Sequence, residues 1–231
     1  MHDDPHRERP LTPRGDEARE RIIQAAVRLF ARKGYAATGI RALATEAGAN
    51  IAMINYYFGG KEGVMKAVID HFFERYMEAA GLDREDFVPG MEGMRQFLTG
   101  LVSFFLANRD LVRVFLIEFP EEVPDLPRHK AAYVRKIIEA VSARHGDYLP
   151  LDKVDPRILM MAGPTMISGL ASHILLKPTI AETGLAKLDD DFYRLLPQVL
   201  ADFLLPGIAN VLQNALAGKY RLDNEGERQD V

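Results

Sequence analysis

The chain has 231 residues, of which 27% are charged and 48% are hydrophobic, and its formal net charge is −4. This length permits a sizeable core in one large or two modest domains, and the composition is that of a soluble globular protein. The acidic balance excludes a protein that coats nucleic acid over its whole surface, and the absence of cysteine excludes disulfides and thiolate chemistry. The N-terminal residues lack the apolar stretch of a secretory signal, so we expect a cytoplasmic protein.

The N-terminal part of the chain predicts helices separated by short turns, because no stretch alternates as a strand would. Apolar residues from 16 to 33 fall at helical spacing, and Gly34 follows them as a stop signal. A second helix is expected to end at Gly48, with Thr38 as its cap, and Asn50 is placed to cap a short third helix. Two helices joined by a tight turn, behind a longer first helix, form the helix-turn-helix pattern.

Longer and more apolar helices are predicted after a connection at residues 81–89. A fourth helix opens at Lys61, and the later ones are expected at residues 91–108, 110–119, 126–144, 156–176 and 190–217. Prolines 164, 197 and 206 are expected to kink or break the last two of these helices. Residues 158–176 are long and apolar enough to cross a bilayer, but Gly163-Pro164, the hydroxyl side chains and His173 favour a buried helix, so no membrane association is expected.

The short third helix has an unusual outer face. In the stretch AGANIAMINYYFGGKEG, residues 47–63, no charged residue occurs from Asn50 to Phe58. Helical spacing places Ile51, Ile54 and Phe58 inward. The outward side chains, Ala52, Met53, Tyr56 and Tyr57, offer methyl groups and hydroxyl donors without any carboxylate, as a helix in a DNA major groove requires. Taken alone, the two tyrosines would be read as ordinary half-buried aromatics, and it is their position after a helix-turn signature that favours contact with DNA.

A family resemblance is carried by the segment RIIQAAVRLFARKGYAATGIRALATEAGANIAMINYYFGGKEGVMKAVI, residues 21–69. It resembles, without gaps, the N-terminal DNA-binding domain of the TetR family of transcriptional regulators. The resemblance implies a homodimer whose two recognition helices enter successive major grooves of a near-palindromic operator, and a small-molecule effector that loosens the complex. It also implies DNA contacts at Thr38, Arg41, Asn50, Ala52, Met53, Asn55, Tyr56, Tyr57 and Lys61.

Three positions depart from the family pattern or leave it undecided. Asn55 replaces a common tyrosine, and its amide suits either an adenine edge or a phosphate. Tyr57 stands where the family often has histidine. Ile51 stands where many members carry a polar residue that faces DNA, whereas periodicity turns it inward, so its role stays open.

The second half of the chain supplies many apolar side chains, which predict either a plain core or a pocket for an apolar or amphipathic effector such as an acyl chain or an aromatic drug-like compound. Glu118 either contacts that ligand or is solvated or paired with an arginine, and His173 bonds either a ligand or a neighbour. The predicted ligand-binding residues are Phe105, Phe115, Glu118, Met161, Met166 and His173. The predicted dimer interface comprises Ser168, Ser172, Leu200, Phe203, Leu204, Ile208 and Val211.

The expected organisation is a disordered tail (1–15), a helix-turn-helix domain (16–60), a helical ligand-binding and dimerisation domain (61–218, with 61–80 as connecting helix) and a polar tail (219–231). The predicted function is a ligand-responsive repressor. The alternatives are an activator, an effector-independent architectural DNA-binding protein, and an all-α enzyme. No cofactor or metal is expected, because the histidines lack ligand spacing. Arg7, Arg9 and Arg14 either reach a minor groove or, with acids interleaved, do nothing.

Overall fold

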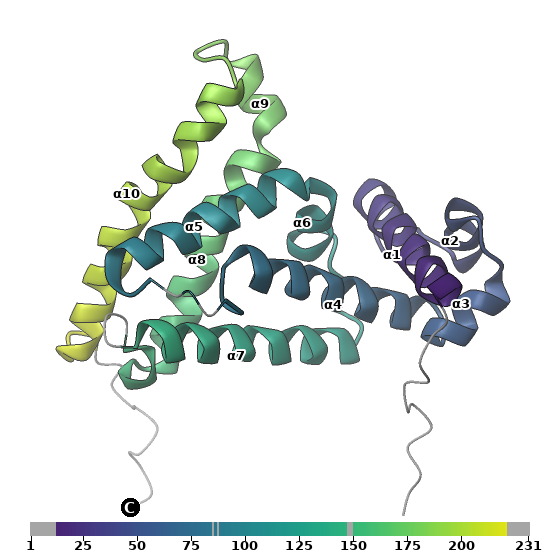
Figure 1. The fold of residues 1–231 in the computed structure, drawn as a ribbon, viewed down its shortest axis with the longest axis horizontal. Helices are drawn as coiled ribbons and strands as arrows, with labels where there is room; N and C mark the ends of the chain where they lie inside the picture. The colour runs from purple at the N-terminus through teal and green to yellow at the C-terminus, as the bar shows by residue number, and fades with distance from the viewer. Residues whose placement is uncertain (1–12, 85, 87, 147–149, 221–231) are drawn as a thin grey trace, which may run out of the picture. The chain divides into compact units, whose positions relative to one another are not determined.

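The computed structural model describes residues 13–84, 86, 88–146 and 150–220. These residues form helices and no strand, so the all-α fold class is confirmed (Figure 1). The elements in chain order are α1 (Pro13–Lys33), α2 (Ile40–Ala47), α3 (Ile51–Phe58), α4 (Lys61–Ala79), α5 (Gly90–Ala107), α6 (Arg109–Leu116), α7 (Asp125–His145), the 3₁₀ helix η1 (Leu151–Lys153), α8 (Pro156–Leu175), α9 (Lys177–Glu182) and α10 (Asp190–Leu216).

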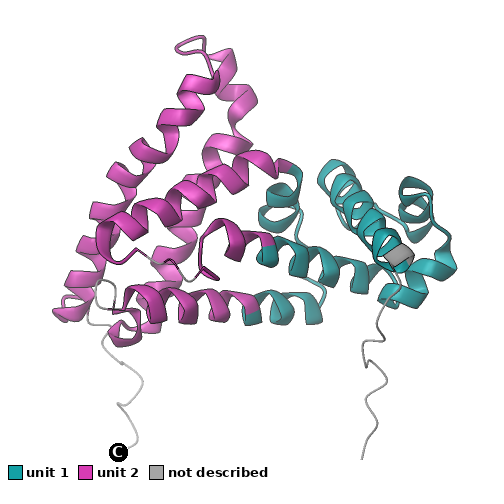
Figure 2. Cartoon of the chain, in the orientation of Figure 1, with its two compact units in different colours: residues 1–74, 110–132 teal, residues 75–109, 133–231 magenta. Residues whose placement is uncertain are grey.

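The chain divides into two compact units, coloured in Figure 2. Unit 1 contains residues 1–74 and 110–132, and unit 2 contains residues 75–109 and 133–231. The unit boundaries fall inside α4 and α7 and directly after Arg109, the first residue of α6. The helix-turn-helix segment therefore shares its unit with the first part of α4 and with α6 and the start of α7. The domain limits at residues 60 and 61 remain a prediction.

The head of unit 1 is built from α1, α2 and α3 around a small apolar core. Ile22 and Phe30 of α1, Leu43 of α2 and Ile54 of α3 are each fully enclosed. Gly48 ends α2 in the left-handed conformation, and the Asn50 Oδ1 accepts a 2.8 Å hydrogen bond from the Met53 amide at the start of α3. Both signals were predicted and both are confirmed.

The predicted cap of α2 was wrong. The helix begins at Ile40 after Gly39, which makes no side-chain cap bond. The Thr38 hydroxyl instead donates backward to the Gly34 carbonyl at 2.8 Å, and the residue is only 1% exposed. Thr38 thus fastens the turn after α1, because its hydroxyl satisfies a carbonyl at the end of that helix.

A glycine-rich turn joins α3 to α4 and fixes where α4 begins. Gly59 and Gly60 both have positive φ, at 71° and 125°. Gly63, in the first turn of α4, permits a close approach: a Cβ there would lie 1.6 Å from the Phe58 carbonyl oxygen. Only glycine lets α4 start against the end of α3, and this places Lys61 next to the end of α3.

Unit 2 is organised around α5, α8 and α10, which pack on one another. Asp155 caps α8 by accepting from the Arg157 amide, and Asp189 caps α10 by accepting from the Phe192 amide. Prolines 164, 197 and 206 lie inside continuous helices, so they do not break them, and the kink that was the other predicted outcome stays a prediction.

The remaining helix limits lie within a few residues of the prediction. α1 begins at Pro13 rather than 16, whereas α6 ends at Leu116 rather than 119. Neither η1 nor α9 was predicted, since a stretch of six residues or fewer carries too little periodicity. Most of the predicted tails, with Arg7 and Arg9, lies outside the described residues, as does the Arg14 side chain.

Two described helices, α8 and α10, are long and apolar enough to cross a bilayer by length and composition, and 22% and 33% of their apolar windows are buried within the chain. Core helices of soluble proteins pass the same test. The physical consequence is that both helices leave apolar surface uncovered in the single chain.

Candidate nucleic-acid interface

The outer face of α3 is uncharged and open to solvent. Ala52 and Asn55 are exposed, Tyr56 is 72% exposed, and Met53 and Tyr57 are half-buried. Ile54, on the opposite side, is completely enclosed and anchors the helix to the head. The side of α3 that periodicity turns outward is therefore the more exposed one, and its contact with DNA stays a prediction.

The aromatic side chains at the end of α3 support one another. The Tyr56 and Tyr57 rings meet edge to face with centroids 5.1 Å apart, and Tyr57 meets Phe58 at 6.4 Å. Such contacts restrict the rotamers of the exposed Tyr56 side chain, so its hydroxyl loses little further conformational entropy when it binds a partner. Ile51 and Phe58 are half-buried, which leaves the role of Ile51 between core and surface.

The polar residues around α3 differ in what they offer a DNA strand. The Oδ1 of Asn50 already accepts the hydrogen bond that caps α3, so its side-chain amide nitrogen is the group that can donate to a phosphate. Arg41 is exposed on the first turn of α2. Thr38 is enclosed and its hydroxyl is engaged, so of the predicted contacts it alone has no surface to present in this structure.

Lys61 lies at the first position of α4 and is half-buried. Its Nζ donates to the Tyr35 carbonyl at 2.9 Å and lies 3.9 Å from the centroid of the Tyr35 ring. Burial lowers the pKa of Lys61 from its ordinary value. Sequence reasoning missed Tyr35, because a contact across 26 residues leaves no local signal.

Basic residues of α1 are partly neutralised by α2. Glu46 accepts from Arg28 Nε at 3.1 Å and lies 3.8 Å from Arg32. The Arg19 guanidinium lies 5.7 Å from the Phe58 ring centroid. The Glu46 pairs link α2 to α1 and the Arg19 contact links α3 to α1, and pairs as exposed as these contribute little stability.

The six predicted ligand-binding residues are not gathered at one site in either unit. Phe115 and Glu118 belong to unit 1, and the others belong to unit 2. Met161 is 61% exposed on α8, so no enclosed pocket surrounds it in the single chain, and its role in ligand binding stays a prediction. Phe105 is fully enclosed, and Met166 is half-buried.

Glu118 pairs with Arg113 at 3.2 Å, as the alternative of pairing with an arginine predicted, and its contact with a ligand stays a prediction. Phe115 is stacked on Phe72 with centroids 3.9 Å apart, and the Lys130 Nζ lies 4.4 Å from its ring centroid. The ring is therefore packed within unit 1. His173 Nδ1 is enclosed and lacks a hydrogen-bond partner among the described residues.

The predicted interface residues divide between core and surface. Leu200 is 6% exposed, so it packs inside its own chain and its assignment to a dimer interface is wrong. Phe203 is 78% exposed, and Leu195 and Val199 precede it at four-residue spacing on the same face of α10. Ser168 is exposed, and the other predicted interface positions, Ser172, Leu204, Ile208 and Val211, are half-buried.

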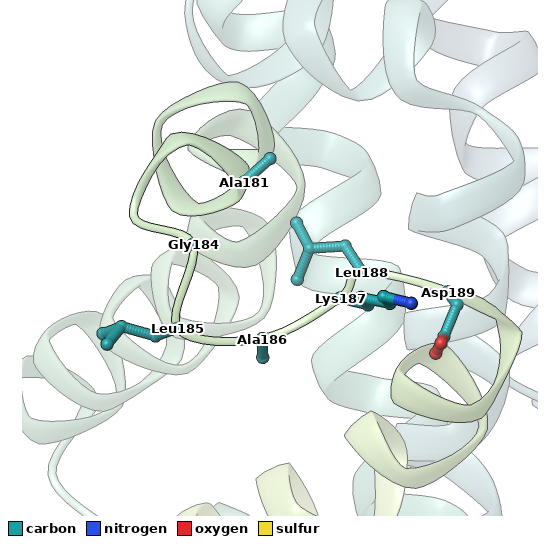
Figure 3. A pocket seen from close by; sticks show the side chains of 7 residues that line it. All are labelled: Ala181, Gly184, Leu185, Ala186, Lys187, Leu188 and Asp189. Carbon is teal, nitrogen blue, oxygen red and sulfur yellow. The ribbon is translucent and has the colours of Figure 1, made fainter.

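A hollow in the loop between α9 and α10 is lined by Ala181 and residues 184–189 and includes none of the predicted ligand residues (Figure 3). One continuous stretch of chain supplies its whole lining, and Leu185 there is 90% exposed. Within the part of the chain that the structure describes, no group of three or more His, Asp or Glu side chains is arranged to hold a metal ion.

The head therefore defines a class: a helix-turn-helix DNA-binding domain with an exposed, uncharged recognition helix. Residues 22–68 match the family model for bacterial regulatory proteins of the tetR family. The chain is 28% identical over 141 residues to the probable HTH-type transcriptional regulator YttP of Bacillus subtilis, which covers 58% of this chain and 68% of the relative. It is 27% identical over 103 residues to the HTH-type transcriptional repressor NicS of Pseudomonas putida, covering 45% of this chain and only 49% of NicS.

Solved structures share the fold over most of the chain. The regulator FadR of Bacillus subtilis in complex with stearoyl-CoA aligns with a TM-score of 0.61 and 18% identity, covering 81% of this chain and 98% of FadR. NalD of Pseudomonas aeruginosa, the secondary repressor of the MexAB-OprM multidrug efflux pump, aligns with a TM-score of 0.58 and 18% identity, covering 85% of this chain and 98% of NalD. The predicted TetR family is confirmed by the family match over residues 22–68, and the solved structures share the fold over most of the chain.

Proposed function

We propose that the chain is a cytoplasmic, homodimeric repressor that binds a near-palindromic operator and releases it when an apolar or amphipathic small molecule binds unit 2. The observation that carries this proposal is the exposed, uncharged face of α3 on a compact head. An apolar and hydroxyl-rich face of this kind suits base edges and thymine methyl groups, and carboxylates would repel the phosphates.

Each proposed DNA-contacting residue has an assigned part. Ala52, Met53 and Asn55 read base edges, because they lie on the outer face of α3. The other proposed residues contact the DNA backbone on both sides of the groove: Arg41, Asn50, Tyr56, Tyr57 and Lys61. Thr38 is enclosed, so it contacts the backbone only if the turn that contains it opens.

The operator is tested by footprinting the purified protein on the DNA that flanks its own gene. We expect protection of one short palindrome, with two half-sites spaced by about one helical turn. An effector-independent architectural protein would instead protect all sequences equally and show only a steep salt dependence. That second result would reject the operator and favour the alternative.

The homodimer is supported by the apolar surface that α8 and α10 leave uncovered. A second copy that packs the same surfaces together would cover both helices and place two heads on one duplex.

The effector proposal draws on the apolar interior of unit 2 and on FadR, whose solved structure holds stearoyl-CoA. Native mass spectrometry of freshly purified protein tests for a co-purified molecule. Stearoyl-CoA is then titrated into the protein–operator complex, with free CoA as the matched control. Release by the acyl form alone supports an acyl effector. Retention in both cases rejects that effector, and aromatic drug-like compounds form the next series. Turnover of any of these molecules would favour an enzyme instead.

A further inference from the structure

Tyr35 occupies a fixed position at the edge of the head. It follows Gly34, which ends α1 with φ of 77°. Its ring meets the Phe30 ring with centroids 5.3 Å apart, and Phe30 is fully enclosed in the core. The Thr38 amide donates to the Tyr35 carbonyl at 3.1 Å. The ring and the carbonyl of Tyr35 are therefore both held by the core and by the turn.

The Lys61 ammonium meets both of these groups at once. Nζ donates to the Tyr35 carbonyl at 2.9 Å, and it lies 3.9 Å from the ring centroid, within the range of a cation–π contact. An ammonium has three N–H donors, so the carbonyl bond leaves donors for an outside acceptor. Lys61 is half-buried rather than enclosed, so such an acceptor can reach it.

We propose that Tyr35 is a positioning residue for DNA binding, whose ring and carbonyl hold the Lys61 ammonium where it receives a backbone phosphate. This inference rests on the proposed function, in which Lys61 contacts phosphate. A lysine that approaches DNA from solvent loses the freedom of a long side chain when it binds. Here that freedom is lost on folding, so binding becomes more favourable than with an unrestrained lysine.

The electrostatic setting supports the same arrangement. Burial lowers the pKa of Lys61, which reflects an ammonium partly stripped of water before DNA arrives. Burial first, and then the carboxylates of Glu62 and Glu122, raise the pKa of Tyr35 above its usual range. The phenol therefore stays neutral at physiological pH, and it is the face of the ring that meets the ammonium.

The test compares Tyr35→Leu, which removes the aromatic face, with Tyr35→Phe, which keeps it. Operator affinity is measured by fluorescence anisotropy at several salt concentrations. We expect Tyr35→Leu to weaken binding about threefold for each Lys61 side chain, or about tenfold for a dimer. The slope of log affinity against log salt falls by up to about 0.9 for each phosphate that Lys61 no longer neutralises. Tyr35→Phe should match the native protein in both measurements.

A double variant separates positioning from a structural role. In a Lys61→Met background, Tyr35→Leu should cause no further loss of affinity, because the residue acts through the ammonium. If Lys61→Met leaves affinity and salt slope unchanged, the phosphate contact of the proposed function fails. If Lys61→Met weakens binding but Tyr35→Leu has no effect, tightens binding or adds an independent loss, the positioning role of Tyr35 is overturned.

A shape-preserving substitution covers the case in which Tyr35→Leu does not fold. Trifluorinated phenylalanine at position 35 keeps the volume of the ring but removes most of the negative charge on its face. Compared with the Tyr35→Phe variant, the trifluorinated variant should bind the operator more weakly and show a shallower dependence of log affinity on log salt. The melting temperatures of the two variants should be equal. Equal affinity for the two rings would overturn the cation–π part of the inference.

Discussion

Phe203 provides the most direct test of the proposed dimer. The side chain is 78% exposed on α10, in line with Leu195 at 55% and Val199 at 52%. Complete burial of a phenylalanine side chain stabilises by about 1.5–3 kcal/mol, so covering the part exposed here is worth ~1–2 kcal/mol. A twofold interface uses the side chain twice, so its removal should cost about 2–4 kcal/mol, which raises the dimer dissociation constant by roughly 30- to 800-fold.

The variant for this test is Phe203→Asp, which also places two carboxylates in the interface and so raises the dissociation constant at least that far. Sedimentation velocity over a range of concentrations gives the constant directly. Ile117→Asp is the matched control, because Ile117 is 53% exposed in unit 1, outside the proposed interface, and receives the same charge. We expect monomers with Phe203→Asp and native dimers with Ile117→Asp. A folded Phe203→Asp protein that dimerises with native affinity would refute the reasoning and move the interface elsewhere.

Three further predictions concern the recognition helix and the effect of pH. Tyr56→Ala should weaken operator binding and leave the melting temperature unchanged, as measured by anisotropy and calorimetry, because 72% of Tyr56 faces solvent. Asn55→Ala and Met53→Ala should change base preference by about 1–3 kcal/mol at one position of the operator, as read from a binding-site selection. His145 is 4% exposed, and burial, followed by the Arg144 charge, lowers its pKa. Its contribution to stability is therefore complete above the unfolded pKa of about 6.5 and is lost as pH falls from there toward the folded pKa, so His145→Gln should flatten the melting temperature between pH 7.5 and 5.5.

Each of these predictions has an outcome that would contradict it. A large drop in melting temperature for Tyr56→Ala would mean that the ring belongs to the core. An equal loss of affinity on every DNA sequence for Asn55→Ala would reduce that residue to a backbone contact. A melting curve for His145→Gln with the same pH dependence as the native protein would show that another group titrates in this range.

The outer face of α3 could be predicted because the signal is local. Asn50 as a cap and Gly48 as a stop act within one turn of chain, and the alternation of Ile54 with Tyr56 follows from 100° per residue. Thr38 was assigned wrongly for a related reason. A threonine before a helix can bond forward or backward, and its choice of the Gly34 carbonyl depends on the turn that α1 and α2 form together.

The ligand-binding and interface residues could not be sorted from the sequence. Leu200 and Phe203 are three residues apart and both apolar, yet one is 6% exposed and the other 78%. Only the packing of α10 on α5 and α8 decides which of its faces is covered. Glu118 and Met161 show the same limit, since pairing with Arg113 and an outer position on α8 depend on neighbours that periodicity does not identify.

By itself, the sequence determined the all-α fold, the helix-turn-helix and the face of α3 that points outward, because helix propensity, capping and spacing act over a few residues. The tertiary structure decided the contacts that join distant segments. It placed Lys61 on Tyr35, drew Glu46 to the arginines of α1 and divided α10 into a buried and an exposed side. These contacts form only when several helices pack at once, so no single stretch of sequence specifies them.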